Sequence, residues 1–207
     1  MDETIPILIA VEDALSEAVL RAMFEQSSSA YTVGNCLGRE GSGYLKKNIV
    51  GFNKSAKGIP FFVLTDLDQT DCPPVLLNNW LSVPKHENLI FRIAVREIES
   101  WLLAHRSAFA AFLGIRTTLI PSRPDELEDP KRSLLQLATR SKKRFLREAI
   151  VPAIGSTAKI GPDYNGALIS FIQTTWMAKE ASKHSPSLNS ALKAIEKFKP
   201  VYGKNTY

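Results

Sequence analysis

The sequence predicts an α/β protein in which a mostly parallel sheet is flanked by helices, with a helical region at the C-terminal end. Apolar runs typical of buried strands alternate with helical patterns as far as about residue 113. Such alternation favours a parallel sheet joined by right-handed crossovers. Strand patterns then fade, whereas helical patterns continue to residue 198. We therefore expect an α/β domain over residues 1–118 and a helical, basic C-terminal region over residues 119–207 packed on it.

The amino-terminal part of the chain predicts two strands that are each followed by a helix. Residues 5–11 form an apolar run, and residues 13–25 then place apolar side chains at helical spacing. A second strand is expected over residues 31–37, and a glycine-rich loop over 38–43 leads into a helix over 44–53. This loop lacks the Gly-Lys-Ser/Thr ending of a P-loop, so an ordinary turn is favoured over a phosphate cradle.

Two further strands and their helices follow. Residues 60–65 predict the third strand, and residues 73–81 predict a helix whose first turn holds two prolines, where proline is tolerated. The fourth strand is expected over residues 89–95 and is followed at once by a helix over residues 96–113. Three more helices are expected over residues 131–150, 164–182 and 187–198.

Charge is distributed unevenly along the chain. Residues 1–100 contain 9 Lys/Arg and 13 Asp/Glu, a net of −4, whereas residues 101–207 contain 17 and 8, a net of +9. An acidic half joined to a basic half suits a polyanionic substrate. Lysine-rich helical surfaces also serve solubility alone, so this alternative stays open.

Targeting segments and cysteine chemistry are not indicated. The amino terminus carries no basic segment ahead of an apolar core, and no apolar stretch approaches the roughly 18 residues that span a bilayer. The two cysteines, Cys36 and Cys72, have neither zinc-site spacing nor a nearby histidine cluster. We therefore expect a soluble cytoplasmic protein with reduced structural thiols and no membrane partner.

Acidic residues follow three of the predicted strands. Asp66 and Asp68 end the third run at positions i and i+2, which share one face of a strand. Glu12 follows the first strand, and the pair Glu97 and Glu99 follows the fourth. Carboxyl ends of parallel strands meet at one sheet edge, where open α/β sheets bind ligands. Such a carboxylate cluster is expected to hold one or two hard divalent cations, Mg²⁺ or Mn²⁺.

The two glutamates after the fourth strand are not equivalent. On a helix, residues two apart diverge by roughly 200°, so one of them is expected to enter the site. Glu99 lies one turn from Val95 and Leu102, on the side that faces the sheet, where a carboxylate needs a partner. We therefore favour Glu99 over Glu97.

The order and spacing of these acids resemble the Toprim fold, a Rossmann-like α/β fold. More narrowly, the chain is similar to small stand-alone bacterial Toprim-like proteins of mobile elements and phage-defence systems, related to the nucleases of the overcoming-lysogenization-defect class. That group has a glutamate after the first strand, an Asp-x-Asp after the third and a glutamate two residues before an aromatic. The resemblance covers residues 5 to about 113 and rests on Val11-Glu12-Asp13, Thr65-Asp66-Leu67-Asp68 and Arg96-Glu97-Ile98-Glu99-Ser100-Trp101.

The resemblance implies a metal-dependent nuclease, with a role in phage or plasmid defence. Toprim domains of topoisomerases and primases work beside other catalytic domains that a chain of 207 residues is too short to contain. A nuclease or a non-catalytic partner subunit is therefore favoured over strand passage or primer synthesis. By resemblance, the metal ligands or proton-transfer residues would be Glu12, Asp66, Asp68 and Glu99, with Glu97 a lesser candidate.

The same aspartates also fit another class of enzyme. Residues 66–70 match the Asp-x-Asp-x-Thr signature of haloacid-dehalogenase-like phosphatases, in which Asp66 would be the nucleophile. That family also requires a later lysine and a strand ending in an acidic pair. The downstream pair Asp125 and Asp129 instead falls in a proline-flanked segment. The third alternative is a Toprim-like subunit that binds nucleic acid or a partner protein without catalysis.

Basic side chains of the second half are the candidates for nucleic-acid binding, with DNA the favoured substrate. Residues 142–147 predict a basic helical patch that would contact a phosphate backbone, although a solvated helix face is the open alternative. The sequence leaves open whether a partner protein or a second copy of the chain takes part. The nucleic-acid-binding candidates are Arg96, Lys142, Lys143, Arg144, Arg147 and Lys159.

Overall fold

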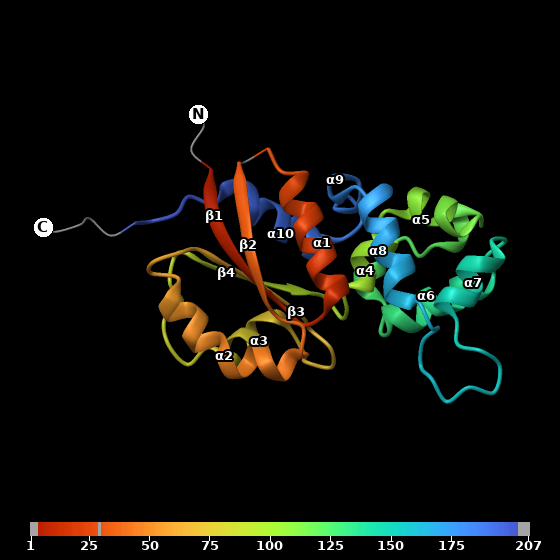
Figure 1. Ribbon diagram of the computed structural model, residues 1–207, viewed down its shortest axis with the longest axis horizontal. Coiled ribbons are helices and arrows are strands. Elements are labelled where there is room, and N and C mark those ends of the chain that lie inside the picture. The colour runs from red at the N-terminus through yellow and green to blue at the C-terminus, as the bar shows by residue number, and fades with distance from the viewer. Residues whose placement is uncertain (1–3, 29, 203–207) are drawn as a thin grey trace, which may run out of the picture. The chain divides into compact units, whose positions relative to one another are not determined.

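The computed structural model describes residues 4–28 and 30–202, and these form two compact units (Figure 1). The sheet unit comprises residues up to Ala94 together with those from Ser190 onward, and the helical unit comprises Val95–Asn189. Compact units and folding domains need not coincide. The expected division at residue 118 therefore stays a prediction.

The sheet unit is built on four parallel strands, which confirms the α/β class and the parallel sheet. The strands are β1 (Ile5–Val11), β2 (Tyr31–Gly38), β3 (Phe61–Asp66) and β4 (Leu89–Ala94), in the order β2-β1-β3-β4. β3 is buried along almost its whole length, as an internal strand covered on both faces should be. Each predicted strand lies within one residue of its observed bounds.

Helices cover both faces of this sheet in a Rossmann-like arrangement. The connections are α1 (Ala14–Glu25), α2 (Ser42–Ser55) and α3 (Pro73–Trp80), and Figure 1 shows α1 on the opposite face from α2 and α3. Across the sheet the chain moves in one direction from β1 to β2 and in the other from β2 to β3 and β4. Because each crossover is right-handed, the connection before this reversal and those after it lie on opposite faces. The C-terminal helix α10 (Pro186–Lys197) returns to the sheet unit, where the Tyr31 hydroxyl donates to the Ile195 carbonyl at 2.6 Å.

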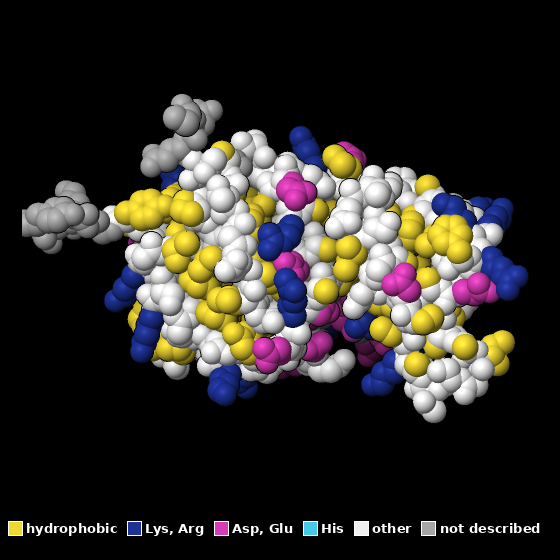
Figure 2. All heavy atoms as spheres, viewed as in Figure 1, with side chains coloured by type: hydrophobic (Ala, Val, Ile, Leu, Met, Phe, Trp, Pro, Cys, Tyr) yellow, Lys and Arg dark blue, Asp and Glu magenta, His cyan; other side chains and the backbone are white. Residues whose placement is uncertain are grey.

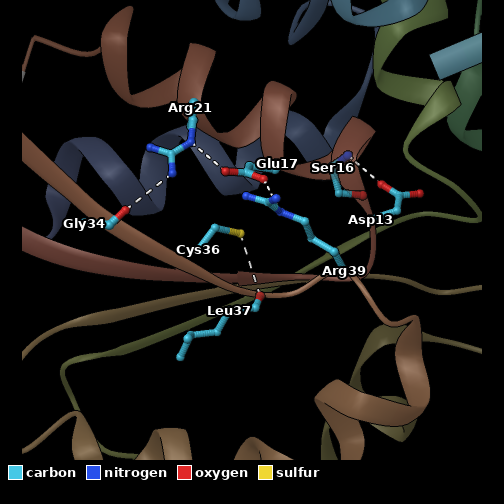
Figure 3. Close-up of polar contacts among 8 residues, drawn as sticks. All are labelled: Asp13, Ser16, Glu17, Arg21, Gly34, Cys36, Leu37 and Arg39. Carbon is cyan, nitrogen blue, oxygen red and sulfur yellow. Dashed lines mark hydrogen bonds and ion pairs between the residues drawn. The ribbon is translucent and has the colours of Figure 1, made fainter. Parts of the chain in front are cut away.

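An ion-pair network joins α1 to the end of β2 (Figure 3). The Glu17 carboxylate accepts from Arg21 Nε at 2.8 Å and pairs with Arg39 Nε at 2.6 Å. Burial opposes ionisation of Glu17, but hydrogen bonds from the two guanidinium groups outweigh it and lower the pKa of this carboxyl. Asp13 caps the same helix by accepting from Ser16 N at 2.7 Å.

The helical unit contains no strand among its described residues, and its helices are shorter than the sequence predicts. Its core includes fully buried Trp101, Phe109, Phe171 and Trp176. None of the helices in the described parts of the chain has both the length and the apolar character needed to cross a bilayer. The elements are α4 (Glu99–Ala104), α5 (Arg106–Leu113), η1 (Thr117–Leu119), η2 (Pro124–Glu126), α6 (Pro130–Thr139), α7 (Arg144–Ile150), α8 (Tyr164–Thr174) and α9 (Ala178–Ala181).

Each of three predicted helices is broken into two in the structure. One of them also begins later than expected. The helix expected over residues 96–113 begins at Glu99, because Arg96 has a left-handed φ of 56°, and it breaks at His105. The helix expected over residues 131–150 is interrupted between α6 and α7, where the Ser141 hydroxyl donates to the Leu113 carbonyl and accepts from Lys143 N. Lys142 and Lys143 therefore precede α7, which corrects the prediction that they lie on a helix.

Candidate functional site

The carboxyl ends of β1 and β3 meet at Glu12, which directly follows β1. Its Oε1 accepts a hydrogen bond from the backbone N–H of Asp66 at 2.8 Å and another from the Thr65 hydroxyl. These contacts join Glu12 to the end of β3, as expected if acids that follow neighbouring parallel strands converge. The structure therefore places the Glu12 carboxylate beside the segment that carries the Asp66 and Asp68 pair.

This position is the topological switch point of the sheet. β1 and β3 are neighbours in the order β2-β1-β3-β4, yet the chain leaves β1 toward β2 on one side and leaves β3 toward β4 on the other. Loops that diverge in this way open a crevice between adjacent strand ends, where open α/β sheets bind ligands. Glu12 and Asp66 are thus located at the place that the topology favours for a ligand.

The electrostatics of Glu12 reflect its burial and its acidic neighbours. Burial raises the pKa of Glu12, hydrogen bonds from Thr65 and Asp66 partly counter it, and the charges of Asp68 and Asp13 raise it further. The Asp68 charge therefore acts on Glu12. Asp68 itself has a left-handed φ of 48°, a conformation that aspartate tolerates better than most residues.

The turn that presents Asp68 is held by backbone hydrogen bonds. Leu67 N donates to the Ala94 carbonyl at 2.9 Å, which continues the pairing between β3 and β4 by one residue, and Thr70 N donates to the Leu67 carbonyl at 3.0 Å. Leu67 is buried between the two aspartates. An apolar anchor between them therefore keeps the Asp-x-Asp segment at the sheet edge.

The glycine-rich loop borders the same edge. Arg39 N donates to the Val11 carbonyl and Gly41 N donates to the Glu12 carbonyl, both at 2.9 Å. Gly38 has a φ of +94°, and a Cβ added there would lie 2.3 Å from the Val11 carbonyl oxygen. Because two amides of the loop are already used by the backbone that follows β1, the structure favours the ordinary turn over the phosphate cradle.

The donor set at this edge fits a hard cation by its chemistry. Carboxylate oxygens are ligands that Mg²⁺ and Mn²⁺ prefer. Within residues 4–28 and 30–202, no group of three or more His, Cys, Asp or Glu side chains is arranged so that it could hold a metal ion. Mg²⁺ commonly binds through one or two carboxylates and completes its shell with water and substrate phosphate oxygens. One or two of the carboxylates of Glu12, Asp66 and Asp68 would suffice for that mode of binding.

The helical unit contains a separate buried carboxyl, Glu99, at the first position of α4. Its side chain is almost fully buried, its Oε1 accepts from the Tyr164 hydroxyl at 2.8 Å, and Lys131 Nζ lies 3.4 Å from the same oxygen. Glu97 is half-buried, and its Oε2 accepts from Lys131 N at 2.8 Å. Glu97 thus contacts the backbone amide of Lys131 and Glu99 its ammonium group, and Glu97 precedes α4, which corrects the expectation that both glutamates lie on one helix.

Burial has the largest effect on the ionisation of Glu99. It raises the pKa of the Glu99 carboxyl, the Lys131 charge lowers it, the Glu97 charge raises it and the Tyr164 hydrogen bond lowers it, with a net increase. Lys131 and Tyr164 were not among the predicted site residues. One feature of the sequence indicated that such partners exist: Glu99 lies on the apolar face of a predicted helix. A carboxylate there requires hydrogen-bond donors from elsewhere in the fold.

The predicted acidic residues thus fall into two groups. Glu12, Asp66 and Asp68 belong to the sheet unit, whereas Glu97 and Glu99 belong to the helical unit. The convergence of all five at one metal site stays a prediction.

The predicted nucleic-acid-binding residues lie on the surface of the helical unit, and several contact their own unit. Lys143 Nζ donates to the Ala111 carbonyl at 3.1 Å, and Arg147 Nη1 donates to the Ser141 carbonyl at 3.0 Å. Arg144 pairs with Glu148 at 2.7 Å on the exposed side of α7. Lys142 and Lys159 are exposed, whereas Arg96 is half-buried in the bend before α4.

The acidic pair that the phosphatase alternative requires has structural roles. Asp125 in η2 accepts from the Ser185 hydroxyl at 2.7 Å and from Ser187 N at 2.9 Å. Asp129 caps α6 by accepting from Arg132 N at 2.7 Å. Neither aspartate follows a strand, so this pair does not supply the acidic strand end of a haloacid-dehalogenase-like site.

Comparison of the chain with models of protein families, with curated proteins and with solved structures found no match. The Toprim resemblance therefore rests on the residues themselves and stays a prediction. The assignment of a function depends on the geometry at the carboxyl ends of β1 and β3.

Proposed function

We propose that this protein is a divalent-metal-dependent nuclease with a Toprim-like site, which hydrolyses phosphodiester bonds of nucleic acid. The observation that carries the proposal is the hydrogen bond from the backbone amide of Asp66 to Glu12 Oε1, which joins the acid that follows β1 to the end of β3, the neighbouring strand. This contact lies at the switch point of a parallel sheet, where ligands bind. Carboxylates at such a place suit a reaction at a phosphate, because they can hold the cation that offsets the charge of the phosphate.

The acidic residues would supply the metal ligands in this proposal. One or two of the carboxylates of Asp66, Asp68 and Glu12 would hold Mg²⁺ or Mn²⁺, which when bound would polarise a phosphoryl oxygen and promote deprotonation of water. The Thr65 hydroxyl and the Asp66 amide orient the Glu12 carboxylate through Oε1.

The charge of the chain supports a polyanionic substrate. The net charge of +9 over residues 101–207 contrasts with −4 over residues 1–100, where the Glu12, Asp66 and Asp68 group lies. A cationic surface attracts a phosphate backbone over long range. Carboxylates at the reaction site repel phosphate unless a bound metal ion offsets their charge. A nucleic acid therefore fits this chain better than a small phosphate monoester.

The decisive experiment incubates the purified protein with single- and double-stranded DNA, with RNA and with a phosphate monoester, in Mg²⁺, Mn²⁺ or chelator. We expect metal-dependent cleavage of a polynucleotide that Asp66→Asn and Asp68→Asn each reduce at least 100-fold. Asparagine is chosen because it tolerates the left-handed backbone of Asp68. The matched control is Asp71→Asn, which neutralises an exposed aspartate in the same loop and should leave the rate unchanged.

Binding of the metal gives a readout that is independent of cleavage. Titration with Mn²⁺ should show binding to the wild-type protein and to Asp71→Asn, with markedly weaker binding to Asp68→Asn. Hydrolysis of the monoester through an aspartyl-phosphate on Asp66 would instead establish the phosphatase alternative. Absence of both cleavage and metal binding would overturn the proposal in favour of a non-catalytic subunit.

A further inference from the structure

The stretch between Asp129 and Glu148 is strongly cationic. Residues 130–147 contain seven Lys/Arg and no Asp/Glu. This stretch forms α6, α7 and the turn between them, and Figure 2 shows Lys and Arg side chains gathered on the surface around α7, at the right of the view. A run of this kind provides the electrostatic attraction that a phosphate backbone needs.

An exposed aromatic side chain lies within this cationic stretch. Phe145, in the first turn of α7, is 67% exposed, whereas Leu146 and Ile150 of the same helix are buried where α7 packs beside α6 and α8. The core of the helical unit therefore does not use the Phe145 ring. Arg144, its neighbour in the sequence, is 81% exposed in its side chain.

Two of the cations near Phe145 in the sequence, Lys143 and Arg147, are oriented by neutral acceptors. Lys143 and Arg147 donate to the carbonyl oxygens of Ala111 and Ser141, which orient the side chains but carry no net charge. The pair between Arg144 and Glu148 is highly exposed, and pairs of this kind contribute little and exchange easily. The stretch thus carries an exposed aromatic ring together with positive charges at neighbouring positions of the sequence.

We propose that Phe145 and the flanking cations form a binding site for single-stranded nucleic acid, in which an unpaired base stacks on the Phe145 ring. Proteins that bind single strands combine cationic grooves with aromatic side chains on which bases stack. In a duplex the faces of the bases are already stacked on one another, so the ring favours unpaired over paired strands. This inference rests on the proposed function and specifies the form of the nucleic acid that the nuclease would bind.

Binding is measured by fluorescence anisotropy of a labelled oligothymidylate in chelator, so that no cleavage occurs. We expect Phe145→Ala to weaken binding roughly 5- to 100-fold, the effect of losing one stacked base. Phe145→Trp should retain the affinity, because indole stacks at least as well. The control Met177→Ala shortens another exposed apolar side chain of the same unit and should leave the affinity unchanged.

Two further measurements separate stacking from electrostatic attraction. An oligonucleotide with abasic residues should bind wild-type protein and Phe145→Ala equally, because it has no base to stack. Lys142→Ala should reduce the slope of log affinity against log salt by about 0.7 on a single strand, whereas Phe145→Ala should leave that slope unchanged. Equal affinity of wild-type protein and Phe145→Ala for oligothymidylate, or tighter binding of a duplex of the same length, would overturn the inference.

The result is distinguishable from failure of the proposed function. Binding that depends on Phe145, with neither metal-dependent cleavage nor metal binding, would overturn the nuclease proposal and leave the single-strand site standing. Cleavage that depends on Asp68 but not on Phe145, together with unchanged oligothymidylate binding by Phe145→Ala, would leave the nuclease proposal standing and overturn the single-strand site.

Discussion

Three glutamates show how partners decide the ionisation of a carboxyl that is partly or fully buried. Burial raises the pKa of Glu12 and of Glu99, whose partners include neutral donors and, for Glu99, a lysine 3.4 Å away. Glu17 is also buried, yet two guanidinium groups at 2.6 and 2.8 Å lower its pKa. Close, charged hydrogen bonds therefore outweigh desolvation only at Glu17 among these three.

Substitution of Glu17 should destabilise the sheet unit. Glu17→Gln removes the charge that Arg21 and Arg39 share, and we expect the free energy of unfolding at pH 7 to fall by about 1–2 kcal/mol. Urea unfolding followed by circular dichroism measures this change. Glu25→Gln, which neutralises an exposed glutamate at the end of the same helix, is the matched control and should change stability by less than about 0.5 kcal/mol.

The stability that the Glu17 carboxylate contributes should depend on pH in a defined direction. The folded-state pKa of Glu17 lies below the unfolded value of about 4.5, so its contribution is present above pH 4.5 and is lost as the pH falls through the folded-state pKa. The difference in stability between wild-type protein and Glu17→Gln should therefore shrink below pH 4.5. A difference that stays constant down to acid pH would show that packing, not charge, accounts for it.

At the scale of elements, the glycines of β2 and α2 show opposite demands on the backbone. Gly38 ends β2 with a φ of +94°, and its Cα approaches the Val11 carbonyl so closely that no side chain fits. Gly51 lies inside α2 on the exposed side, and a Cβ added there would meet no atom within 4 Å. The first glycine is required by the fold, whereas the second weakens its helix.

Alanine at these two positions should therefore change stability in opposite directions. Gly38→Ala should lower the free energy of unfolding by about 2 kcal/mol or more, because it combines a steric clash with a strained φ. Gly51→Ala should raise it by about 0.5–1 kcal/mol through better helix propensity. Thermal and urea unfolding of both variants test this pair, and a loss of stability in Gly51→Ala would contradict the prediction.

The helices of the helical unit are ended by contacts that lie far away in the sequence. His105 breaks the run between α4 and α5, and its Nδ1 accepts from Met177 N at 3.0 Å. Trp176 lies between α8 and α9, and its indole donates to the Trp101 carbonyl at 3.0 Å. These breaks exist because each one satisfies a polar group of another helix.

At the scale of the whole chain, the sheet unit combines residues up to Ala94 with residues from Ser190 onward. Asn88 is fully buried just before β4, and its side chain donates to the Ala56 carbonyl at 3.1 Å and to the Val201 carbonyl at 2.8 Å. Val201 N donates back to Asn88 Oδ1 at 2.7 Å. One amide thus joins the end of α2, the start of β4 and the segment after α10, so the sheet unit needs residues from both of these parts of the chain.

Loss of the Asn88 amide should weaken the attachment of the segment after α10 to the sheet unit. Asn88→Ala leaves the buried Ala56 carbonyl and the Val201 backbone without these partners, and we expect the free energy of unfolding to fall by about 2–4 kcal/mol. Hydrogen exchange should also become faster at Val201 and along the second half of α10. Asn79→Ala, at an exposed position of α3, is the control and should leave both quantities unchanged. Unaltered exchange at Val201 in Asn88→Ala would show that other contacts hold the segment.

The class of fold and the place of the acidic group were determined by the sequence alone. Strands such as Phe61–Asp66 are short apolar runs bounded by turn residues, and their alternation with helices leaves few topologies other than a parallel sheet. In such a sheet, acids that follow β1 and β3 must emerge at one edge. The proximity of Glu12 and Asp66 therefore follows from local pattern and topology.

The tertiary structure alone decided the ends of the later helices and the partners of the buried glutamates. Apolar periodicity continues through His105 and Ser141, so no local signal marks a break, and the breaks form because distant backbone groups are satisfied there. Lys131 and Tyr164 reach Glu99 from positions 32 and 65 residues along the chain. Pairings of this kind depend on how the helices pack in three dimensions. The sequence indicates only that a buried carboxyl needs partners, not which residues they are.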